Sequence, residues 1–399
     1  MNNQWRFGAE ELKYLQQVID SGYGSSTEGS MNNQFERIFA EKVGAKYAIT
    51  FNSGTSTLHA ALEAAGVNYG DEVITTPLTV ISNLSVILAQ NAVPVFADID
   101  EKTFNIDPEE IAKKITPRTK AIMPVSLYGL SCDLDAIMAL GKKHNIAVIN
   151  DAAEAHMAEF NHTPIAKLAD ITSYSTENSK HLTTGDGGIV VTDNEEYAIQ
   201  MRKFGSLGYA AMKSGDGRIR LNKDIFQNPN YKRHDAFGYN YRMPEVAAAL
   251  GLAQAEKLDH FIDLRIKIAN LYNDVIRSCD YLIPQFTPKG YKNTYWTFTL
   301  SFENKDVSWT DFRKKFMELG GDGIYSAWAL LYHETLVTSG AFKKRCPPLY
   351  DKLHYPIQGL CPVAEKLQPK LMQFTTNHGS VALAEPIADA LAKTIQYYK

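Results

Sequence analysis

The sequence predicts an α/β protein whose mainly parallel, seven-stranded sheet lies between helices and is followed by a smaller α+β C-terminal domain. Short runs rich in β-branched residues recur between residues 46 and 192, and stretches with helical period separate most of them. Strands that alternate with helices indicate βαβ units, which form parallel sheets covered on both faces. The predicted strands span residues 47–51, 72–76, 94–99, 121–128, 146–150, 171–175 and 188–192, and helices at 55–65, 80–90 and 133–143 lie between them.

Chain length and a change of pattern after Pro244 divide the chain into two predicted domains. A chain of 399 residues is long for one compact core. The later part of the sequence has predicted helices at 245–276, 309–319 and 382–398 and an aromatic strand at 295–302. We therefore predict a large α/β domain over residues 1–255 and a small domain over residues 256–399.

Composition and charge exclude several classes of partner. A net charge of -4 gives no broad positive field of the kind that binds phosphate backbones, so nucleic acid is not expected as a partner. The four cysteines stand far apart and the ten histidines lack ligand spacing, so we expect neither disulfides nor a metal site. The sequence has no apolar run typical of a secretion signal or a membrane span, and the expected location is the cytoplasm.

The most informative segment is the polar loop between the last two predicted strands of the sheet. It reads S-Y-S-T-E-N-S-K-H-L-T-T-G-D-G-G from Ser173 to Gly188 and holds one lysine, Lys180. Most lysines are solvated surface residues. The alternative is an imine with an aldehyde cofactor, which requires a lysine in a partly desolvated pocket. Ligands bind beyond the carboxyl ends of parallel strands, where this loop is expected to lie.

Pyridoxal phosphate (PLP) requires a lysine for its aldehyde, an acid to hold the pyridine nitrogen protonated, and an anion cradle for its phosphate. Asp151 follows an apolar strand and is a candidate for the acid, although an Asp that opens D-A-A-E is equally well explained as a helix N-cap. The segment N-S-G-T-S-T, residues 52–57, turns from a strand into a helix whose N-terminal amides could bind the phosphate. Three such elements after three strands of one sheet predict a PLP site.

The chain resembles the DegT/DnrJ/StrS sugar aminotransferases from about Phe7 to Tyr398. The resemblance implies the fold type I architecture of PLP-dependent aminotransferases, with pyridoxal 5'-phosphate as the cofactor. The matching segments are F-N-S-G-T-S-T-L-H-A-A-L (51–62), P-V-F-A-D-I-D (94–100), P-V-S-L-Y-G (124–129), N-D-A-A-E-A (150–155), S-K-H-L-T-T-G-D-G-G (179–188) and G-Y-N-Y-R-M-P-E (238–245).

The family pattern implies roles for individual residues of these segments. Lys180 would be the catalytic Schiff-base lysine, and Asp151 would hold the pyridine nitrogen. Gly54 and Thr55 would give backbone amides to the phosphate, and Ser175 would give its hydroxyl.

The same pattern implies a homodimer with shared active sites. Asn240 would reach the phosphate that is bound by the neighbouring subunit. Arg242 would either assist there or form a structural salt bridge, and the sequence leaves both alternatives open.

Three positions need separate interpretation. Val80 stands where many members of the family place an aromatic residue that stacks on the cofactor ring. Glu154 stands where Gln or His often lies beside the cofactor's hydroxyl; we expect this cofactor-binding candidate to be protonated or turned away, since a carboxylate would repel an ionised phenolic oxygen. His181 is expected to be a loop residue, although related dehydratases carry histidine at the position of Lys180.

The predicted activity is that of a PLP-dependent transaminase. An amino donor, L-glutamate, would give its amino group to the cofactor, and a keto or aldehydo sugar would then take it. Lys180 would move the proton as general base and acid, while Asp151 keeps the pyridine ring cationic. Both substrates are small molecules.

Two other hypotheses stay open. A sugar dehydratase or an epimerase could use the same scaffold, but only a transaminase would release 2-oxoglutarate in step with the amino sugar. A non-catalytic PLP-binding sensor could also use it. Such regulators normally carry a DNA-binding segment, whereas this sequence has no basic arm and keeps both Lys180 and Asp151.

Finer motifs bear on the identity of the sugar. Nucleotide-linked 3-keto or 4-keto sugars are the commonest substrates that the family implies. The segments S-T-E-N-S-K-H (175–181), G-G-D-G-I-Y-S-A-W (320–328) and C-P-V-A-E-K-L-Q (361–368) resemble a subgroup that includes the transaminase making 8-amino-3,8-dideoxy-manno-octulosonate for lipopolysaccharide. That substrate is a free sugar acid without a nucleotide. Tyr325 and Trp328 are otherwise explained as apolar packing of the second domain.

Overall fold

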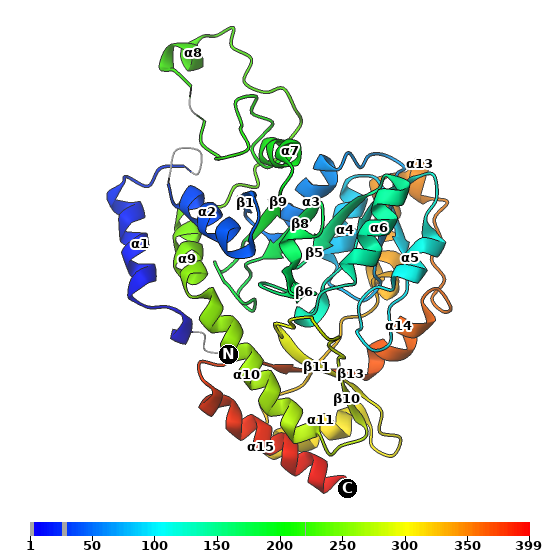
Figure 1. Ribbon diagram of the computed structural model, residues 1–399. Coiled ribbons are helices and arrows are strands. Elements are labelled where there is room, and N and C mark those ends of the chain that lie inside the picture. The colour runs from blue at the N-terminus through cyan, green and yellow to red at the C-terminus, as the bar shows by residue number, and fades with distance from the viewer. Residues whose placement is uncertain (1–3, 26–29, 220) are drawn as a thin grey trace.

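Seven strands form the central sheet of the computed structural model, which describes residues 4–25, 30–219 and 221–399 (Figure 1). Strand β9 is antiparallel to both of its neighbours, β1 and β8, and the remaining pairs are parallel. The prediction of a mainly parallel, seven-stranded sheet is therefore confirmed. In spatial order the strands are β1 (Tyr47–Phe51), β9 (Gly188–Thr192), β8 (Ile171–Ser175), β5 (Ala147–Asp151), β4 (Thr119–Met123), β2 (Glu72–Thr75) and β3 (Val93–Phe96).

Helices cover both faces of this sheet because neighbouring residues of a strand point to opposite sides. In β9, Ile189 and Val191 pack with one helix layer, whereas Val190 packs with the other. The first layer contains α2 (Met31–Val43), α5 (Pro108–Lys114), α6 (Leu134–His144) and α9 (Glu245–Glu256). The second contains α3 (Gly54–Ala64), α4 (Ser82–Ala89) and α7 (Glu195–Gly205).

A smaller α+β unit follows, with a four-stranded antiparallel sheet and three long helices. Helices α10 and α15 pack against each other, and their apolar side chains share one core with β11 and β13. The strands are β10 (Leu282–Pro284), β11 (Thr297–Phe302), β13 (Leu371–Thr375) and β12 (Tyr325–Ser326), and the helices are α10 (Leu258–Ile276), α11 (Trp309–Glu318) and α15 (Val381–Tyr397).

The single long helix predicted over residues 245–276 is in fact two helices, α9 and α10, that meet at Lys257. The backbone of Lys257 leaves the helical region, with φ -97° and ψ 0°. Its ammonium group donates to the carbonyl oxygen of Arg6 at 3.0 Å and pairs with the carboxylate of Glu11. Contacts with the N-terminal segment thus accompany the break, and local sequence does not encode them.

The segment between β12 and β13 returns to the large sheet and ties the smaller unit to it. The Tyr350 hydroxyl donates to the carbonyl oxygen of Ala92 at 3.0 Å, and the Asp98 carboxylate accepts from the backbone of Val363 and Ala364 at 2.8 and 2.9 Å. The segment's short helices are η4 (Leu331–His333), α12 (Thr335–Thr338), η5 (Ala341–Arg345), α13 (Pro347–Tyr350), α14 (Pro362–Leu367) and η6 (Gln368–Lys370).

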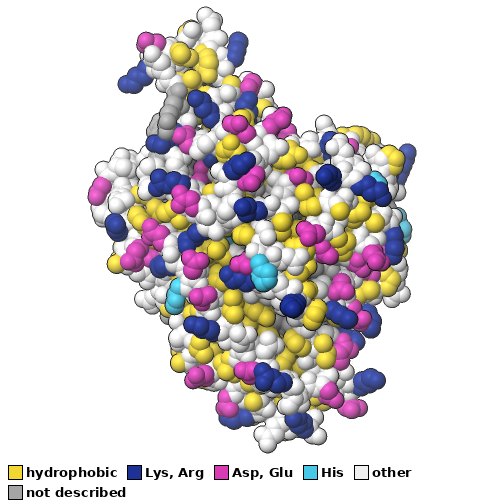
Figure 2. All heavy atoms as spheres, viewed as in Figure 1, with side chains coloured by type: hydrophobic (Ala, Val, Ile, Leu, Met, Phe, Trp, Pro, Cys, Tyr) yellow, Lys and Arg dark blue, Asp and Glu magenta, His cyan; other side chains and the backbone are white. Residues whose placement is uncertain are grey.

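A projecting segment between α7 and α9 carries the short helix α8 (Lys223–Gln227) away from the body of the protein (Figure 1). Hydrophobic side chains are exposed on it, including Ile225, Phe226 and Phe237, of which Phe237 is 69% exposed. Figure 2 shows acidic and basic groups interspersed over the visible face, without a broad basic surface.

Six further elements complete the described chain, and none of its helices is both long and apolar enough to cross a membrane. These elements are η1 (Gln4–Arg6), α1 (Ala9–Asp20), η2 (Leu127–Gly129), η3 (Ile165–Lys167), β6 (Glu159–Phe160) and β7 (Thr163–Pro164).

Candidate active site

A cavity of about 340 Å³ lies at the carboxyl ends of the central strands, between the two units of the fold. Its volume lies in the range of roughly 300–1,000 Å³ that is typical of small-molecule sites. Residues that are far apart in the sequence meet here. Five of the predicted site residues line the cavity, namely Gly54, Thr55, Asp151, Ser175 and Lys180.

One end of the cavity is built around the N-terminus of α3. The Ser53 hydroxyl caps the helix by accepting from the backbone of Ser56 at 3.0 Å. A Cβ atom on Gly54 would lie 3.0 Å from Cβ of Ser175, and one on Gly188 would lie 2.6 Å from the carbonyl oxygen of Ser53. The two glycines therefore let β8 and β9 approach the first turn of α3 closely. Free amides and the positive end of the helix dipole make this end suited to an anion.

Asp151 ends β5 and is only 2% exposed. Its Oδ1 accepts a hydrogen bond from the backbone of Ala153 at 3.0 Å. Residues 152–158 form turns, and the next regular element is β6, so no helix begins at Asp151 and the N-cap alternative is wrong. Burial raises the pKa of Asp151 to about 6, although the bond from Ala153 and the charge of Lys180 lower it. The fold therefore places a carboxylate where it is costly to ionise without a cationic partner.

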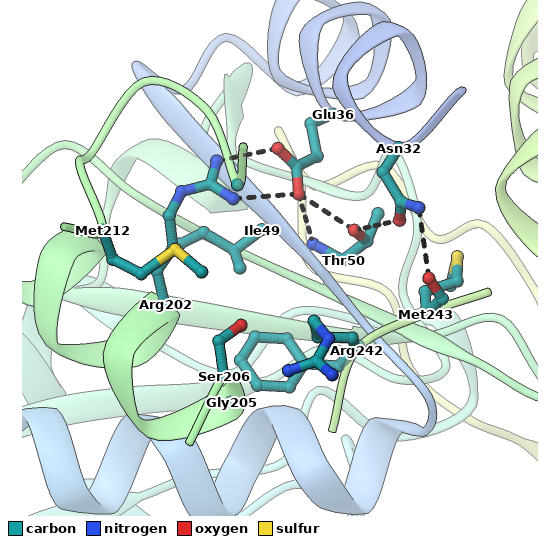
Figure 3. Close-up of a pocket in the computed structure, with 12 residues that line it drawn as sticks. Asn32, Glu36, Ile49, Thr50, Arg202, Gly205, Ser206, Met212, Arg242 and Met243 are labelled. Atoms are coloured by element: carbon teal, nitrogen blue, oxygen red, sulfur yellow. Dashed lines mark hydrogen bonds and ion pairs between the residues drawn. The ribbon is translucent and has the colours of Figure 1, made fainter. Parts of the chain in front are cut away.

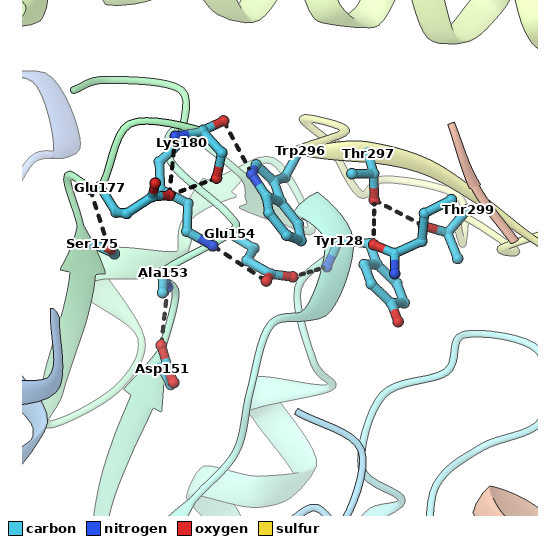
Figure 4. Close-up of polar contacts among 12 residues, drawn as sticks. Tyr128, Asp151, Ala153, Glu154, Ser175, Glu177, Lys180, Trp296, Thr297 and Thr299 are labelled. Carbon is cyan, nitrogen blue, oxygen red and sulfur yellow. Dashed lines mark hydrogen bonds and ion pairs between the residues drawn. The ribbon is translucent and has the colours of Figure 1, made fainter. Parts of the chain in front are cut away.

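Lys180 lies on the loop between β8 and β9, and its side chain is 11% exposed. Its Nζ lies 3.3 Å from Oε1 of Glu154 and 3.8 Å from the ring centroid of Trp296 (Figure 4). Glu154 also accepts from the backbone of Tyr128 at 3.0 Å through Oε2. Burial raises the pKa of Glu154, and the ammonium group of Lys180 opposes that shift. Glu154 thus faces the lysine amine, although it does not itself line the cavity.

Two buried arginines hold the backbone around Lys180. Arg6 donates to the carbonyl oxygens of Lys180 at 2.9 Å and His181 at 2.6 Å. Arg265 of α10 donates to the carbonyl oxygens of Ser179 at 3.0 Å and Lys180 at 3.3 Å. Burial lowers the pKa of Arg6 to about 10 and that of Arg265 well below its usual value. These guanidinium groups fix the loop from the N-terminal segment and from the smaller unit.

His181 points away from the cavity and into the core. Its Nε2 lies 3.0 Å from the carbonyl oxygen of Thr294, and its ring centroid lies 5.3 Å from that of His156. Burial, with the nearby charge of Arg265, lowers the pKa of His181, so the ring is neutral at physiological pH. His181 is therefore a packed loop residue that presents no group to the cavity.

Two tryptophans that the sequence did not assign to the site line the cavity. The rings of Trp296 and Trp328 are stacked, with centroids 5.9 Å apart and an interplanar angle of 13°. Val80 lines the same cavity. The sequence left two explanations for Trp328, a segment shared with a subgroup of the family and apolar packing of the second domain. Neither places it at this cavity, since its direction depends on how the smaller unit docks.

Asn240 and Arg242 lie outside this cavity. Asn240 is exposed, and its backbone pairs with that of Ser206. Arg242 borders a separate small cavity and forms no ion pair with any described carboxylate, so the structure does not support the salt-bridge alternative (Figure 3). The ion pair at that cavity joins Arg202 and Glu36, whose Nη2 and Oε2 atoms are 2.7 Å apart.

The side chains and amides of the larger cavity fit the three requirements of PLP. Lys180 offers an amine in a mostly buried position, and Asp151 offers a buried carboxylate that a bound cation would stabilise. The first turn of α3, which the glycines Gly54 and Gly188 allow β8 and β9 to approach closely, offers helix N-terminal amides to a phosphate.

Both the sequence and the structure of this chain are similar to those of known proteins. The sequence pattern of the DegT/DnrJ/EryC1/StrS aminotransferase family matches residues 6–371. The chain is 37% identical over 303 residues to the spore coat polysaccharide biosynthesis protein SpsC of Bacillus subtilis, covering 76% of each chain. It is 35% identical over 298 residues to GDP-perosamine synthase of Caulobacter vibrioides, covering 74% of this chain and 75% of that one. The crystal structure of an aminotransferase from Psychrobacter cryohalolentis, 30% identical, superposes with a TM-score of 0.84 and covers 98% of both chains.

Proposed function

Because this chain belongs to the DegT/DnrJ/EryC1/StrS aminotransferase family, and is thus a PLP-dependent sugar aminotransferase, we propose that Lys180 holds the cofactor and that L-glutamate donates the amino group. One observation carries the proposal: the amine of Lys180, the carboxylate of Asp151 and the N-terminus of α3 border a single cavity. Gly54, Thr55 and Ser175 then bind the phosphate.

PLP, when bound, supplies an electron sink for the electron pair that remains when a substrate carbon loses its proton. Lys180 Nζ takes that proton from the α-carbon of the donor and later returns a proton to the sugar carbon, acting as general base and then acid. Asp151 holds a proton at the pyridine nitrogen. The indole of Trp296 limits the access of water to the lysine amine, because the ring lies 3.8 Å from Nζ.

Measuring both products of the reaction tests this proposal. The protein is incubated with L-glutamate and a panel of keto and aldehydo sugars, and 2-oxoglutarate and amino sugar are measured together. Equal amounts of the two products are expected. Sugar turnover without 2-oxoglutarate would instead identify a dehydratase or an epimerase.

For the sugar itself we propose an octulosonate with an aldehyde at C8, which gives 8-amino-3,8-dideoxy-manno-octulosonate for lipopolysaccharide. Three segments, 175–181, 320–328 and 361–368, support this choice. The similarity to GDP-perosamine synthase favours a second candidate, a nucleotide-linked 4-keto sugar. The ratio of kcat/KM for the two sugars decides between them.

We also propose the cytoplasm as the location. All four cysteines are free, and three of them are buried. Free thiols are typical of proteins in a reducing compartment. Fractionation of the native cells would test this location directly.

A homodimer with shared active sites is the proposed assembly. Asn240 and Arg242 lie outside the cavity of their own chain, and Arg242 has no acidic partner among the described residues. The projecting segment on which both residues lie also exposes Phe237 and Tyr239. A second subunit that covers these side chains would bring the amide of Asn240 to its phosphate.

Asn240→Ala is expected to weaken cofactor binding by roughly 10- to 100-fold, since a hydrogen bond to a charged group contributes about 1.5–3 kcal/mol. Cofactor dissociation, measured by equilibrium dialysis, checks the change. Dilution of the wild-type protein should release cofactor and activity together. The control is Asn230→Ala, on the same projecting segment. A fully active monomer, or unchanged affinity in Asn240→Ala, contradicts the shared site.

Glu154 is expected to take up a proton when the cofactor binds. Its only cationic partner within 4 Å among the described residues is the ammonium group of Lys180. That charge is lost or moved when the amine joins the cofactor, and a buried carboxylate without a partner binds a proton instead. Calorimetry in two buffers of different ionisation enthalpy measures proton uptake at pH 7 to 8. The wild-type protein should take up as much as about one proton more per cofactor than Glu154→Gln. Equal uptake by both would show that Glu154 stays ionised, and Glu109→Gln is an exposed control.

A further inference from the structure

A second cavity of about 260 Å³ lies behind the tryptophans of the active site. We call it the tryptophan cavity. Strands β11, β12 and β13 of the smaller unit form its wall, and Trp296, Trp328 and Ser179 line both this cavity and the larger one. The two cavities therefore share a border. A molecule whose reacting carbon is at Lys180 Nζ, 3.8 Å from the Trp296 ring centroid, can extend past the indole into the tryptophan cavity.

Among the described residues, the lining of the tryptophan cavity combines aromatic faces with neutral polar groups and contains no charged side chain. Arg265 lies nearby, but it is buried and its two terminal nitrogens already donate to protein oxygens, including Oδ1 of Asn377 at 2.9 Å. An anionic group placed in the cavity would find no counter-ion among these described lining residues and would lose its hydration. The chemistry of the wall thus favours a neutral ligand.

Several hydrogen-bonding groups line the cavity. The Gln373 amide donates to the carbonyl oxygen of Ser326 at 2.9 Å and accepts from the Thr297 hydroxyl at 3.3 Å, so its orientation is set by two strands. The Tyr325 hydroxyl and the Trp328 indole N–H have no hydrogen-bond partner in the described part of the chain, and Tyr325 is 53% exposed. These groups can donate to a ligand. An oriented amide and unpaired donors beside flat aromatic faces suit a sugar, which has apolar C–H surfaces and many hydroxyls.

We propose that the tryptophan cavity is the subsite for the hydroxylated, non-reacting carbons of the sugar, while any carboxylate or diphosphate of the same substrate stays outside it. This inference rests on the proposed aminotransferase function. It assigns to Tyr325 and Trp328 a role in the specificity for the sugar. It assigns to the cavity no role in binding the amino donor.

The test variant is Tyr325→Ala, because Tyr325 borders only the tryptophan cavity of the two and is exposed enough for the fold to tolerate the change. We expect KM for the sugar to rise about 10-fold, with KM for L-glutamate unchanged. A binding measurement without turnover accompanies the kinetics. Two of the four tryptophans line the cavity, so 3-deoxy-manno-octulosonate or GDP-mannose should quench the intrinsic fluorescence of the cofactor-loaded protein. Quenching should need about 10-fold more sugar in the variant.

The outcomes separate this inference from the proposed function. The control is Tyr69→Ala, an exposed tyrosine outside both cavities, which should leave both KM values unchanged. A raised KM for glutamate in Tyr325→Ala would assign the cavity to the amino donor and overturn the inference. Unchanged KM for the sugar, or no quenching of the wild-type protein by either sugar, would also overturn it. Failure of the wild-type protein to aminate any sugar would refute the function, whereas sugar quenching would still report on the cavity.

Discussion

Lys180→Ala is expected to abolish transamination, lowering kcat by roughly 10⁴-fold or more, because one side chain is both the attachment point and the proton carrier. The visible absorbance of lysine-bound cofactor should disappear with it. Circular dichroism should be unchanged, since the loop around residue 180 is held through its backbone carbonyls by Arg6 and Arg265. Stopped-flow measurement of the half-reaction with L-glutamate checks the rate.

The matched control for this variant is Lys167→Ala, an exposed lysine of η3 that is outside the cavity. It should retain wild-type rates and absorbance. The truncation at position 180 leaves Glu154 without its ion-pair partner, and that carboxyl is then expected to be protonated. Retained transaminase activity in Lys180→Ala would refute the assignment of the lysine.

Asp151→Asn is expected to slow proton removal from the substrate by about 10³-fold, because the negative charge that keeps the pyridine nitrogen protonated is lost. The variant should still fold and bind cofactor, since an amide oxygen can replace the carboxylate oxygen that accepts from Ala153. A primary isotope effect with α-deuterated glutamate identifies the slowed step. Near-normal turnover would refute the role of Asp151.

The same substitution has a pH-dependent effect on stability in the cofactor-free protein. Burial raises the pKa of Asp151 from 3.8 to about 6, so ionisation of the carboxyl in the folded state costs free energy. The wild-type protein therefore loses stability relative to Asp151→Asn as the pH rises from about 4 to about 6, and the difference is constant at higher pH. At pH 8 the variant should be more stable by up to about 3 kcal/mol, and the difference should vanish below pH 4. Urea unfolding at both pH values measures it. Asp133→Asn is the control, because Asp133 is an exposed N-cap of α6.

The sheet was largely predictable because the residue pattern within each strand identifies it as a strand. The runs at residues 47–51, 171–175 and 188–192 coincide with β1, β8 and β9, since β-branched residues buried on both faces give a continuous apolar pattern. The break at Lys257 had no such signal. It involves a carbonyl oxygen and a carboxylate from the N-terminal segment, which are more than 240 positions away.

The site residues were predictable only where a reactive side chain follows a predicted strand. Lys180 and Asp151 could be found because each follows a predicted strand, and the topology of a parallel sheet brings such positions to one edge. Trp296, Trp328 and Arg265 could not be found this way. Their contributions depend on how the smaller unit docks, which the periodicity of its own elements does not determine.

The two arginines that hold the loop around Lys180 also affect how the chain forms its active site during synthesis. Arg6 contacts the loop across 174 positions, and Arg265 contacts it across 85 positions from the other direction. Contacts of such sequence separation form late, because the intervening chain must first be ordered. A nascent chain in which the central sheet has formed, but residue 265 has not yet emerged from the ribosome, holds its lysine on a loop that is only partly fixed. The cofactor therefore meets a finished attachment site only after α10 has docked.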